Sequence, residues 1–452
     1  MCLEASLGEL NIWTRAFSRL CLRASGLTRS TTATKVDDPH KARPLTKPPR
    51  SNAVNFVLVT IFLDSIGFGI VMPVVPQLVM ELGHVTLAKA TGIGGWLSVI
   101  YALLQFLCGP LMGNLGDRYG RRPVLLAAMA GLGSDYLMMA FAPSLAWLFV
   151  GRALAGIFGA SFGPAQAALA DLTPPEGRAR VFGFVGAAFG TGFIVGPAIG
   201  GLLGEFGPRA PFYAAATLSG INLLYGLFVF PETLSKERRR PFDPRRANPL
   251  GALLSLRKLQ GVLPLASVNF FWMLAHMVYP ATWAYFAIAR YGWSSGMIGA
   301  SLAFVGTTMV LVQMLLLGRI VKRLGEWRAA LLGMTGGVIS FLCFMLTTQG
   351  WMAFVVMAVT AIEAIAGPSL SAMMSSRAPD DAQGELQGFN QSVSAIASII
   401  APLLLNPALA YFTSRAAPVY FPGAAFAIAA FAATVALLIL LAIGRPRAVA
   451  HS

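Results

Sequence analysis

The sequence predicts an all-α membrane protein with twelve transmembrane helices, arranged as two pseudo-symmetric six-helix halves. Of its 452 residues, 56% are hydrophobic and only 12% are charged, whereas a soluble domain carries about 25% charged residues. Apolar stretches about 20 residues long repeat from Ala53 onward, as a bilayer about 30 Å thick requires. Equivalent glycines and prolines recur in both parts of the chain, which indicates a duplicated plan.

The apolar stretches give the expected helices in chain order. In the first half they cover residues 54–79, 92–112, 122–142, 145–167, 179–203 and 210–231. In the second half they cover residues 260–288, 296–317, 328–348, 351–374, 386–411 and 420–443. Duplicated six-helix halves are typical of alternating-access carriers, whose site lies between the halves near the midplane.

The duplication rests on residues that match at a nearly constant offset along the chain. The matched pairs are Gly113 with Gly318, Gly120 with Gly325, Gly183 with Gly388, Pro197 with Pro402, Pro164 with Pro368, and Pro175 with Pro379. Several independent matches at one offset favour duplication over chance.

The net charge of +15 and a pI of about 10.1 suggest a nucleic-acid partner, but the placement of the charges argues against one. Of the 34 Lys and Arg residues, only Lys89, Arg209, Arg290 and Arg415 fall in loops on one side, and Arg152 falls within a span. The others lie in the tails and in loops on the opposite side, which is the positive-inside bias. This bias predicts an integral protein of the cell (inner or plasma) membrane with both termini in the cytoplasm.

The expected spans also divide the chain. Residues 1–52 contain no stretch long enough to span, and we expect a disordered or mis-assigned N-terminal extension there. The first half covers 53–231, a basic cytoplasmic linker 232–259, the second half 260–444 and a cytoplasmic tail 445–452. The four cysteines show no metal or disulfide spacing, so we expect no metal and no cofactor.

The loop after the second helix reads G-N-L-G-D-R-Y-G-R-R-P over residues 113–123. Its two glycines are expected to permit a tight turn, while its carboxylate can cap a helix or pair with an arginine that follows it. Such a charge network suits a gate that holds in one state and releases in another, whereas a solvated basic loop needs neither feature. The residues of this expected cytoplasmic gate are Gly113, Asp117, Arg118, Gly120, Arg121 and Arg122.

That loop closely resembles the signature loop of the major facilitator superfamily. The second half holds an eroded copy, G-R-I-V-K-R-L-G-E-W-R over residues 318–328, without an acid at the position equivalent to Asp117. The stretch D-S-I-G-F-G-I-V-M-P-V-V-P over residues 64–76 resembles helix 1 of the tetracycline efflux proteins. The resemblance covers nearly the whole chain beyond residue 52 and includes L-G-S-D-Y-L-M-M-A-F around Asp135 and P-A-T-W around Pro280.

Helix 5 carries G-T-G-F-I-V-G-P-A-I-G-G over residues 190–201, which resembles the motif of drug–proton antiporters. Glycines and a proline in a membrane helix allow close helix contact and a kink. Their regular spacing favours a packing seam where the two halves slide, although packing glycines occur in any membrane helix. The residues concerned are Gly190, Gly192, Gly196, Pro197, Gly200 and Gly201.

Four charged residues fall inside expected spans: Asp64, Asp135, Arg152 and Glu363. Each costs a few kcal/mol in hydrocarbon unless it is paired or hydrated. Asp135 and Arg152 lie equally far from the tight turn at Pro143–Ser144, so an antiparallel hairpin places them at one depth and a pair is expected. That pair can be a purely structural salt bridge or a proton-linked switch.

The resemblance implies that helices 1, 4, 7 and 10 line a central cavity, which places Asp64, Arg152, His276 and Glu363 near it. A lone histidine is equally well explained as a hydrogen-bonded packing residue. Tetracycline exporters have a histidine in helix 8 and an acid in helix 9, but this chain has Met309 and Gly337 there. We hypothesise that Glu363 in helix 10 replaces the missing carboxylate.

Further polar or aromatic residues in the spans are candidates for the wall of the substrate cavity. They are Gln105, Gln166, Asn269, Trp272, Gln313, Asn390 and Gln391. Bridging of neighbouring helices or ordinary packing explains any one of them equally well.

The leading hypothesis is proton-coupled export of an amphipathic small molecule, as in tetracycline efflux, with the proton gradient as the energy source. The expected partners are that substrate, protons and the lipid bilayer, with the chain acting as a monomer. A carrier of the same fold that imports a nutrient or exports one specific metabolite is the alternative. A membrane enzyme is disfavoured because the sequence has no H-E-x-x-H motif, Walker loop or paired Cys/His set.

Overall fold

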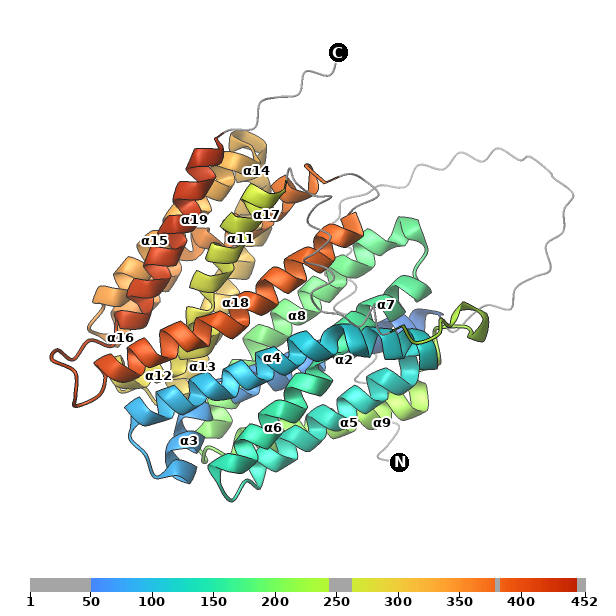
Figure 1. Ribbon diagram of the computed structural model, residues 1–452, viewed down its shortest axis with the longest axis horizontal. Helices are drawn as coiled ribbons and strands as arrows, with labels where there is room; N and C mark the ends of the chain where they lie inside the picture. The colour runs from blue at the N-terminus through green and yellow to red at the C-terminus, as the bar shows by residue number, and fades with distance from the viewer. Residues whose placement is uncertain (1–49, 244–261, 379–382, 445–452) are drawn as a thin grey trace, which may run out of the picture. The chain divides into compact units, whose positions relative to one another are not determined.

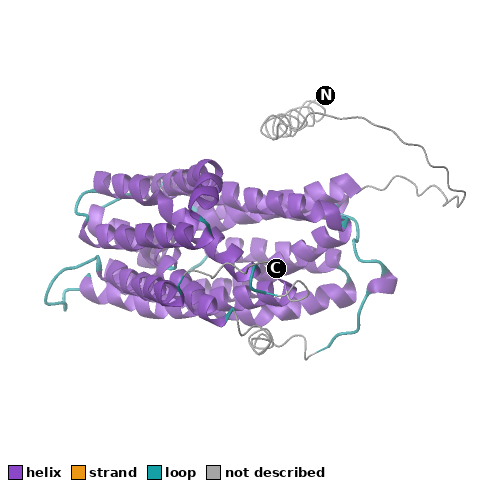
Figure 2. Cartoon of the chain, turned by 90° about the horizontal axis from the view of Figure 1, so that it is seen from above, coloured by secondary structure: helices purple, strands orange, loops and turns teal. Residues whose placement is uncertain are grey.

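A computed structural model describes residues 50–243, 262–378 and 383–444, which form helices and no strand (Figures 1 and 2). Residues 1–49 of the expected N-terminal extension, most of the linker and the tail lie outside these ranges, while the last three residues of that extension belong to the first helix. The helices run side by side, as the predicted all-α membrane fold requires.

The first half contains six helical spans. They are α2 (Arg50–Val71) with α3 (Val75–Gly83), α4 (Leu87–Tyr119), α5 (Arg121–Ala140), α6 (Leu145–Phe158) with η1 (Gly159–Ser161) and α7 (Phe162–Leu172), α8 (Pro175–Gly204) and α9 (Ala210–Val229). A short turn of helix, η2 (Lys236–Arg238), follows in the linker.

The second half also contains six spans within the described residues. They are α11 (Leu263–His276) with α12 (Val278–Tyr291), α13 (Ser295–Val312) with η4 (Gln313–Leu317) and α14 (Gly318–Leu324), α15 (Glu326–Leu346), α16 (Gly350–Thr360) with η5 (Ala361–Ile365) and α17 (Ala366–Ser375), α18 (Gln383–Phe412), and α19 (Ala424–Ile443).

Eleven of these spans are single helical runs long and apolar enough to cross a membrane, among the described residues. The seventh is divided at Met277 into two helices of 14 residues each. Pro280 explains the division, because proline lacks the N–H that would bond the carbonyl of His276. With this divided span the predicted twelve helices are complete.

The helix breaks repeat between the halves and support the duplication. The fourth span contains the 3₁₀ turn η1, between α6 and α7, just before Pro164. The tenth span contains the 3₁₀ turn η5, between α16 and α17, just before Pro368. Each proline removes one helical hydrogen bond in the preceding turn. Pro164 and Pro368 are one of the matched pairs in the sequence, so both halves distort the same helix at the same place.

The glycines of α8 form two different seams. Gly192, Gly196 and Gly200 face α2, where a Cβ on Gly200 would overlap the carbonyl of Ile70. Gly201 instead faces α13 of the other half, where its Cβ would lie 2.8 Å from Gly299 Cα. The expectation of a seam between sliding halves is therefore wrong for most of this motif, because three of its glycines pack within the first half.

The bundle has two ends, and the halves are joined at one of them. We call the end with Arg50, Gly120 and Gly444 the proximal end, and the end with the α3–α4, α8–α9 and α12–α13 connections the distal end (Figure 1). Within the described residues, hydrogen bonds join the halves at the distal end: Ser295 to Gln77, Gly296 and Ser294 to Glu205, and Asn406 to Thr91.

Glycines toward the proximal end have free space instead. A Cβ at Gly109 or Gly113 of α4, Gly183 or Gly186 of α8, Gly318 of α14 or Gly388 of α18 would meet no atom within 4 Å. The helices that pair the halves, α4 with α18 and α8 with α13, therefore pack closely toward the distal end.

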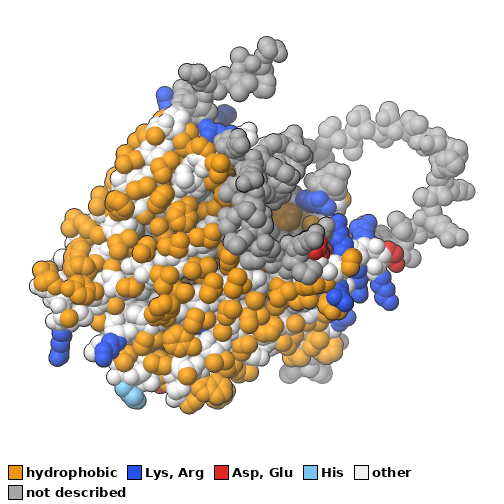
Figure 3. All heavy atoms as spheres, viewed as in Figure 1, with side chains coloured by type: hydrophobic (Ala, Val, Ile, Leu, Met, Phe, Trp, Pro, Cys, Tyr) orange, Lys and Arg blue, Asp and Glu red, His pale blue; other side chains and the backbone are white. Residues whose placement is uncertain are grey.

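The surface shows the division into apolar flank and charged ends that a bilayer demands. Apolar side chains cover the visible face over α4, α18 and α19, whereas Lys and Arg side chains gather at the ends, with a large group near the linker (Figure 3). On this face the basic side chains of the described residues therefore lie at the ends of the bundle, outside the apolar flank (Figure 3).

The two α8 glycines Gly200 and Gly190 should respond oppositely to the same change. Gly200→Ala should lower the melting temperature of the purified protein, because overpacking costs about 1–3 kcal/mol. Gly190→Ala is the matched control, since a Cβ there would meet no atom within 4 Å, and its melting temperature should stay at or above that of the parent. Equal melting temperatures for both variants would contradict the α2–α8 seam.

Candidate functional site

Asp135 and Arg152 form an ion pair between α5 and α6, between Arg152 Nη2 and Asp135 Oδ2. The hairpin turn brings them to the same depth, so the pair expected from the sequence is present. The Asp135 side chain is fully buried and that of Arg152 is 14% exposed. Gly151 leaves room for the carboxylate, because a Cβ there would lie 2.7 Å from Asp135 Oδ1. Asp135 Oδ1 and Arg152 Nε have no partner.

The ion pair lies against α4. The guanidinium carbon of Arg152 is 5.9 Å from the ring centroid of Tyr101, a distance typical of a cation–π contact. Gln105 donates to the Tyr101 hydroxyl at 3.1 Å and to the carbonyl of Gly159 at 3.2 Å. Gln105 thus contacts the charge cluster and links α4 to the 3₁₀ turn η1 of the fourth span.

Asp64 on α2 completes this cluster. Its carboxyl interacts electrostatically with Tyr101 and with Tyr136, the residue next to Asp135. It is half-buried and makes no hydrogen bond or ion pair with the described residues. A Cβ at Gly67 would lie 2.8 Å from the Tyr136 hydroxyl, so glycine allows α2 to approach α5 here. This interior cluster therefore holds one carboxyl paired with an arginine, Asp135, and one without a counter-charge, Asp64.

Glu363 lies in the 3₁₀ turn η5 and is 4% exposed. Hydroxyls of Ser340 on α15 and Tyr279 on α12 are its hydrogen-bonding neighbours, whereas Oε2 has no partner. The two hydroxyls are 3.3 Å apart, and Thr360 donates to Ser340 at 2.9 Å. The second half thus buries a carboxyl among hydroxyls, with no basic side chain paired to it in the described residues.

Trp272 and His276 are packed beside this carboxyl. His276 Nδ1 lies 3.0 Å from the Trp272 carbonyl, and its ring centroid is 5.3 Å from that of Phe341. Trp272 is 2% exposed, and a Cβ at Gly337 would lie 2.5 Å from its indole ring. Trp272 therefore belongs to the core of the second half rather than to a cavity wall, which corrects the expectation from sequence.

The other expected cavity residues are scattered. Gln313 is exposed in the π-helical segment η4 and donates to the carbonyl of Ala364 at 3.4 Å. Gln391 is exposed, and Asn390 is half-buried with an unpartnered Oδ1. Gln166 and Asn269 are half-buried.

The gate sequence folds differently from the expected loop. Gly113 lies within α4, which continues to Tyr119, so the tight turn is made by Gly120 alone, at φ +107°. Asp117 pairs with Arg121 at 2.6 Å, one helical turn apart across Gly120. Arg122 instead donates to the carbonyl of Leu227 on α9, at 2.7 Å, and Arg118 is exposed over the Tyr119 ring.

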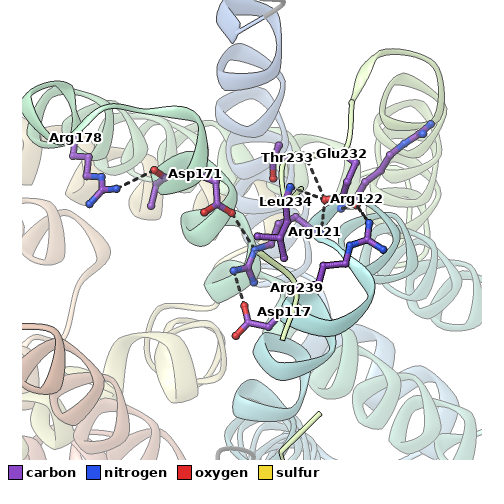
Figure 4. A network of polar contacts seen from close by, with 10 residues as sticks. Asp117, Arg121, Arg122, Asp171, Arg178, Glu232, Thr233, Leu234 and Arg239 are labelled. Carbon is purple, nitrogen blue, oxygen red and sulfur yellow. Dashed lines mark hydrogen bonds and ion pairs between the residues drawn. The ribbon is translucent and has the colours of Figure 1, made fainter. Parts of the chain in front are cut away.

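Two acids that the sequence analysis did not single out complete this network (Figure 4). Asp171, at the end of α7, lies 3.4 Å from Arg121. Glu232, just after α9, accepts from the backbone N–H groups of Arg121 at 2.8 Å and Arg122 at 3.3 Å, which caps α5. A Cβ at Gly120 would overlap this carboxylate. Both acids lie outside the repeated motif, so only their position in otherwise basic segments could have drawn attention to them.

The linker segment after Glu232 continues over the same motif. The Arg240 N–H donates to the Asp117 carbonyl at 3.1 Å, and Asn114 donates to the Asp243 carbonyl at 2.6 Å. A cavity of about 580 Å³ lies between the segment and the helices. It is lined by Asp117, Arg121, Asp171, Leu234, Glu237, Arg238, Arg239 and Arg240.

A divided twelve-helix bundle with paired charge in its interior defines a membrane transport fold, and residues 57–402 match the model of the Major Facilitator Superfamily. The chain belongs to this superfamily. It is 42% identical over 357 residues to the class C tetracycline resistance protein of Escherichia coli, which covers 79% of this chain and 89% of that protein. The class B tetracycline resistance protein of Escherichia coli is 36% identical over 356 residues, 78% of this chain and 88% of that protein.

Solved structures support the same fold. The human organic anion transporter MFSD10 (TETRAN) matches with a TM-score of 0.65 at 23% identity, covering 87% of this chain and all of that one. A bacterial homologue of the human lysosomal transporter Spinster, in an inward-facing and occupied conformation, matches with a TM-score of 0.67 at 15% identity, covering 88% and 97%. The chain is thus an integral membrane protein with the twelve-helix superfamily fold.

The buried ion pair predicts a specific pattern of stabilities. Asp135→Asn should destabilise the protein by about 3–5 kcal/mol, because it leaves Arg152 without its counter-charge. Adding Arg152→Gln should restore part of this loss, since the double variant buries no unpaired charge. Denaturation of the purified single and double variants measures the coupling, and additive losses would show that the pair is not coupled.

Proposed function

We propose that this protein exports amphipathic, tetracycline-like small molecules in exchange for protons, by alternating access between its two halves. The observation that carries the proposal is the interior cluster of the first half, where the unpaired Asp64 adjoins the Asp135–Arg152 pair. An ionisable group inside a membrane protein marks an ion or substrate pathway by default. The tetracycline resistance relatives supply the substrate class.

We infer that the proximal end faces the cytoplasm. It carries the basic gate motif and the linker arginines, whereas the distal end carries Lys89, Arg209, Arg290 and Arg415. Cytoplasmic loops carry the excess of basic residues. With this orientation the first and last described residues, Arg50 and Gly444, lie on the cytoplasmic side, and the closely packed distal end faces the outside.

Exchange requires that proton and substrate bind to alternative states of one site. In the proposed cycle a proton enters from outside and neutralises a carboxyl of the first-half cluster. Neutralising Asp135 would weaken its attraction to Arg152, and neutralising Asp64 would remove the charge beside Tyr101 and Tyr136. Either change removes a negative charge from the cluster and so weakens its attraction for a positively charged group of the substrate. In the proposed cycle, proton entry from outside therefore favours substrate release there.

Glu363 is proposed as the coupling carboxyl of the second half. A Cβ at Gly337 would lie 3.5 Å from Glu363 Oε2. The carboxyl of Glu363, in the tenth span, therefore lies beside Gly337 of α15, the ninth span. The resemblance places the acid of tetracycline exporters at this position of the ninth span. The location of the charge is kept although the helix that carries it differs, and the unpartnered Oε2 leaves a place for a proton.

Transport into inverted membrane vesicles tests the function directly. Tetracycline should accumulate when a proton gradient is imposed, and an uncoupler should abolish the accumulation. Asp64→Asn should abolish it as well, because the amide cannot take up a proton, while leaving the melting temperature near that of the parent. Accumulation that ignores the uncoupler would refute proton exchange, and absence of any accumulation would favour a carrier for another metabolite.

Glu363→Gln tests the second-half carboxyl, since the amide retains hydrogen bonding to Ser340 and Tyr279 but cannot be protonated in the same way. Gradient-driven uptake should fall toward the level of passive leak. Glu81→Gln is the matched control, because Glu81 is an exposed carboxylate that pairs with Arg209 at 3.3 Å, and uptake should be unchanged. Full gradient-driven uptake by Glu363→Gln would refute the assignment.

A further inference from the structure

The second half inserts two polar side chains into a notch on α4 at the distal end. A Cβ at Gly94 would overlap the Tyr285 hydroxyl of α12, and a Cβ at Gly95 would lie 2.8 Å from Asn406 Cβ of α18. Bare backbone at both positions lets these helices approach closely. Because the notch belongs to one half and its occupants to the other, opening the distal end must separate them.

Asn406 is fully buried in this contact. Its Nδ2 donates to the Thr91 carbonyl of α4 at 3.1 Å and to the Ala281 carbonyl of α12 at 3.2 Å. One amide group therefore ties α18 to both halves of the bundle. Its Oδ1 has no partner in the described residues.

A buried amide with an unsatisfied oxygen stabilises the closed state less than a fully hydrogen-bonded amide would. Leaving such a group unpaired costs free energy, which offsets part of the stabilisation from the two hydrogen bonds of Nδ2. When the interface opens, water can satisfy the oxygen, so the penalty applies in the closed state alone. The side chain of Asn406 thus favours closure through its two hydrogen bonds, but by less than a fully satisfied amide would.

Glu205 makes the corresponding contact on the other side of the bundle. The Gly296 N–H at the start of α13 donates to Glu205 Oε1 at 2.6 Å. Hydrogen bonds from the Ser294 hydroxyl and this N–H lower the pKa of Glu205, so the carboxylate is ionised at neutral pH. A carboxylate of the first half therefore caps a helix of the second half, where the helix dipole favours negative charge.

We propose that Asn406 and Glu205 form a two-point releasable latch that holds the distal end closed and sets how often it opens outward. The latch joins both helix pairs that connect the halves, α4 with α18 and α8 with α13. It rests on the proposed alternating access, which requires this end to open. These two contacts are hydrogen bonds, so each can be broken and reformed in a cycle.

The test measures the distance between the halves by double electron–electron resonance, without substrate or gradient. Spin labels are attached at His84 and Val419, exposed positions of the distal end on opposite halves, in a chain whose native cysteines are replaced. Asn406→Ala loses two hydrogen bonds, and Glu205→Gln loses the negative charge that strengthens the cap of α13. Each should raise the population with the longer distance roughly three- to tenfold.

Two matched controls separate the latch from general loss of packing. Asn222 is a fully buried asparagine that bonds Thr60 at 3.2 Å within the first half, and Glu81 is an exposed distal carboxylate paired within the same half. Asn222→Ala and Glu81→Gln should leave the distance distribution unchanged, even where Asn222→Ala lowers the melting temperature.

Distances that are unchanged in Asn406→Ala and Glu205→Gln, or that change equally in the controls, would overturn the latch. Glu205→Gln keeps the test valid if Asn406→Ala fails to fold, because Glu205 is exposed. Failure of the parent to transport tetracycline would remove the proposed substrate but would leave the distance result intact, so the two failures are distinguishable.

Discussion

An ionised side chain costs several kcal/mol in hydrocarbon unless it is paired, hydrated or hydrogen-bonded, and the arrangement of this protein follows from that constraint. Basic residues gather at the ends of the bundle, and the interior charges are either neutralised or surrounded by hydroxyls. Asp135 has Arg152, and Glu363 has Ser340 and Tyr279. Asp64 is the exception, with neighbours but no counter-charge, and it therefore has most to gain from binding a proton or a cationic group.

The two halves meet this constraint by different means. The first half uses an ion pair with an aromatic neighbour, whereas the second buries a carboxyl in a 3₁₀ turn among hydroxyls and aromatic rings. The turn η5 exists because Pro368 interrupts the tenth span, just as Pro164 interrupts the fourth span after η1. Duplication thus supplied the same backbone distortion twice, and the side chains placed at it have diverged.

Sequence alone predicted the features that depend on local pattern. Span length gave the twelve helices, and equal distance from a turn gave the Asp135–Arg152 pair. The partners of the gate motif could not be found in this way, because Asp171 and Glu232 approach Arg121 only through the tertiary fold. Periodicity likewise could not show that Gly113 is helical while Gly120 turns the chain, or that Trp272 is buried over Gly337, since each depends on what packs opposite.

A carrier needs interfaces that close firmly and still reopen. Apolar seals alone would favour one state too strongly, because no group in them gains from contact with water. At the distal end the close approach comes from glycines, Gly94 and Gly95 on α4 and Gly201 against Gly299, which contribute little surface of their own. The specific contacts are polar groups that water can replace, and the proximal gate is likewise built from ion pairs and helix caps. Small residues thus bring the helices together, and in the proposed cycle exchangeable polar bonds decide which end is closed.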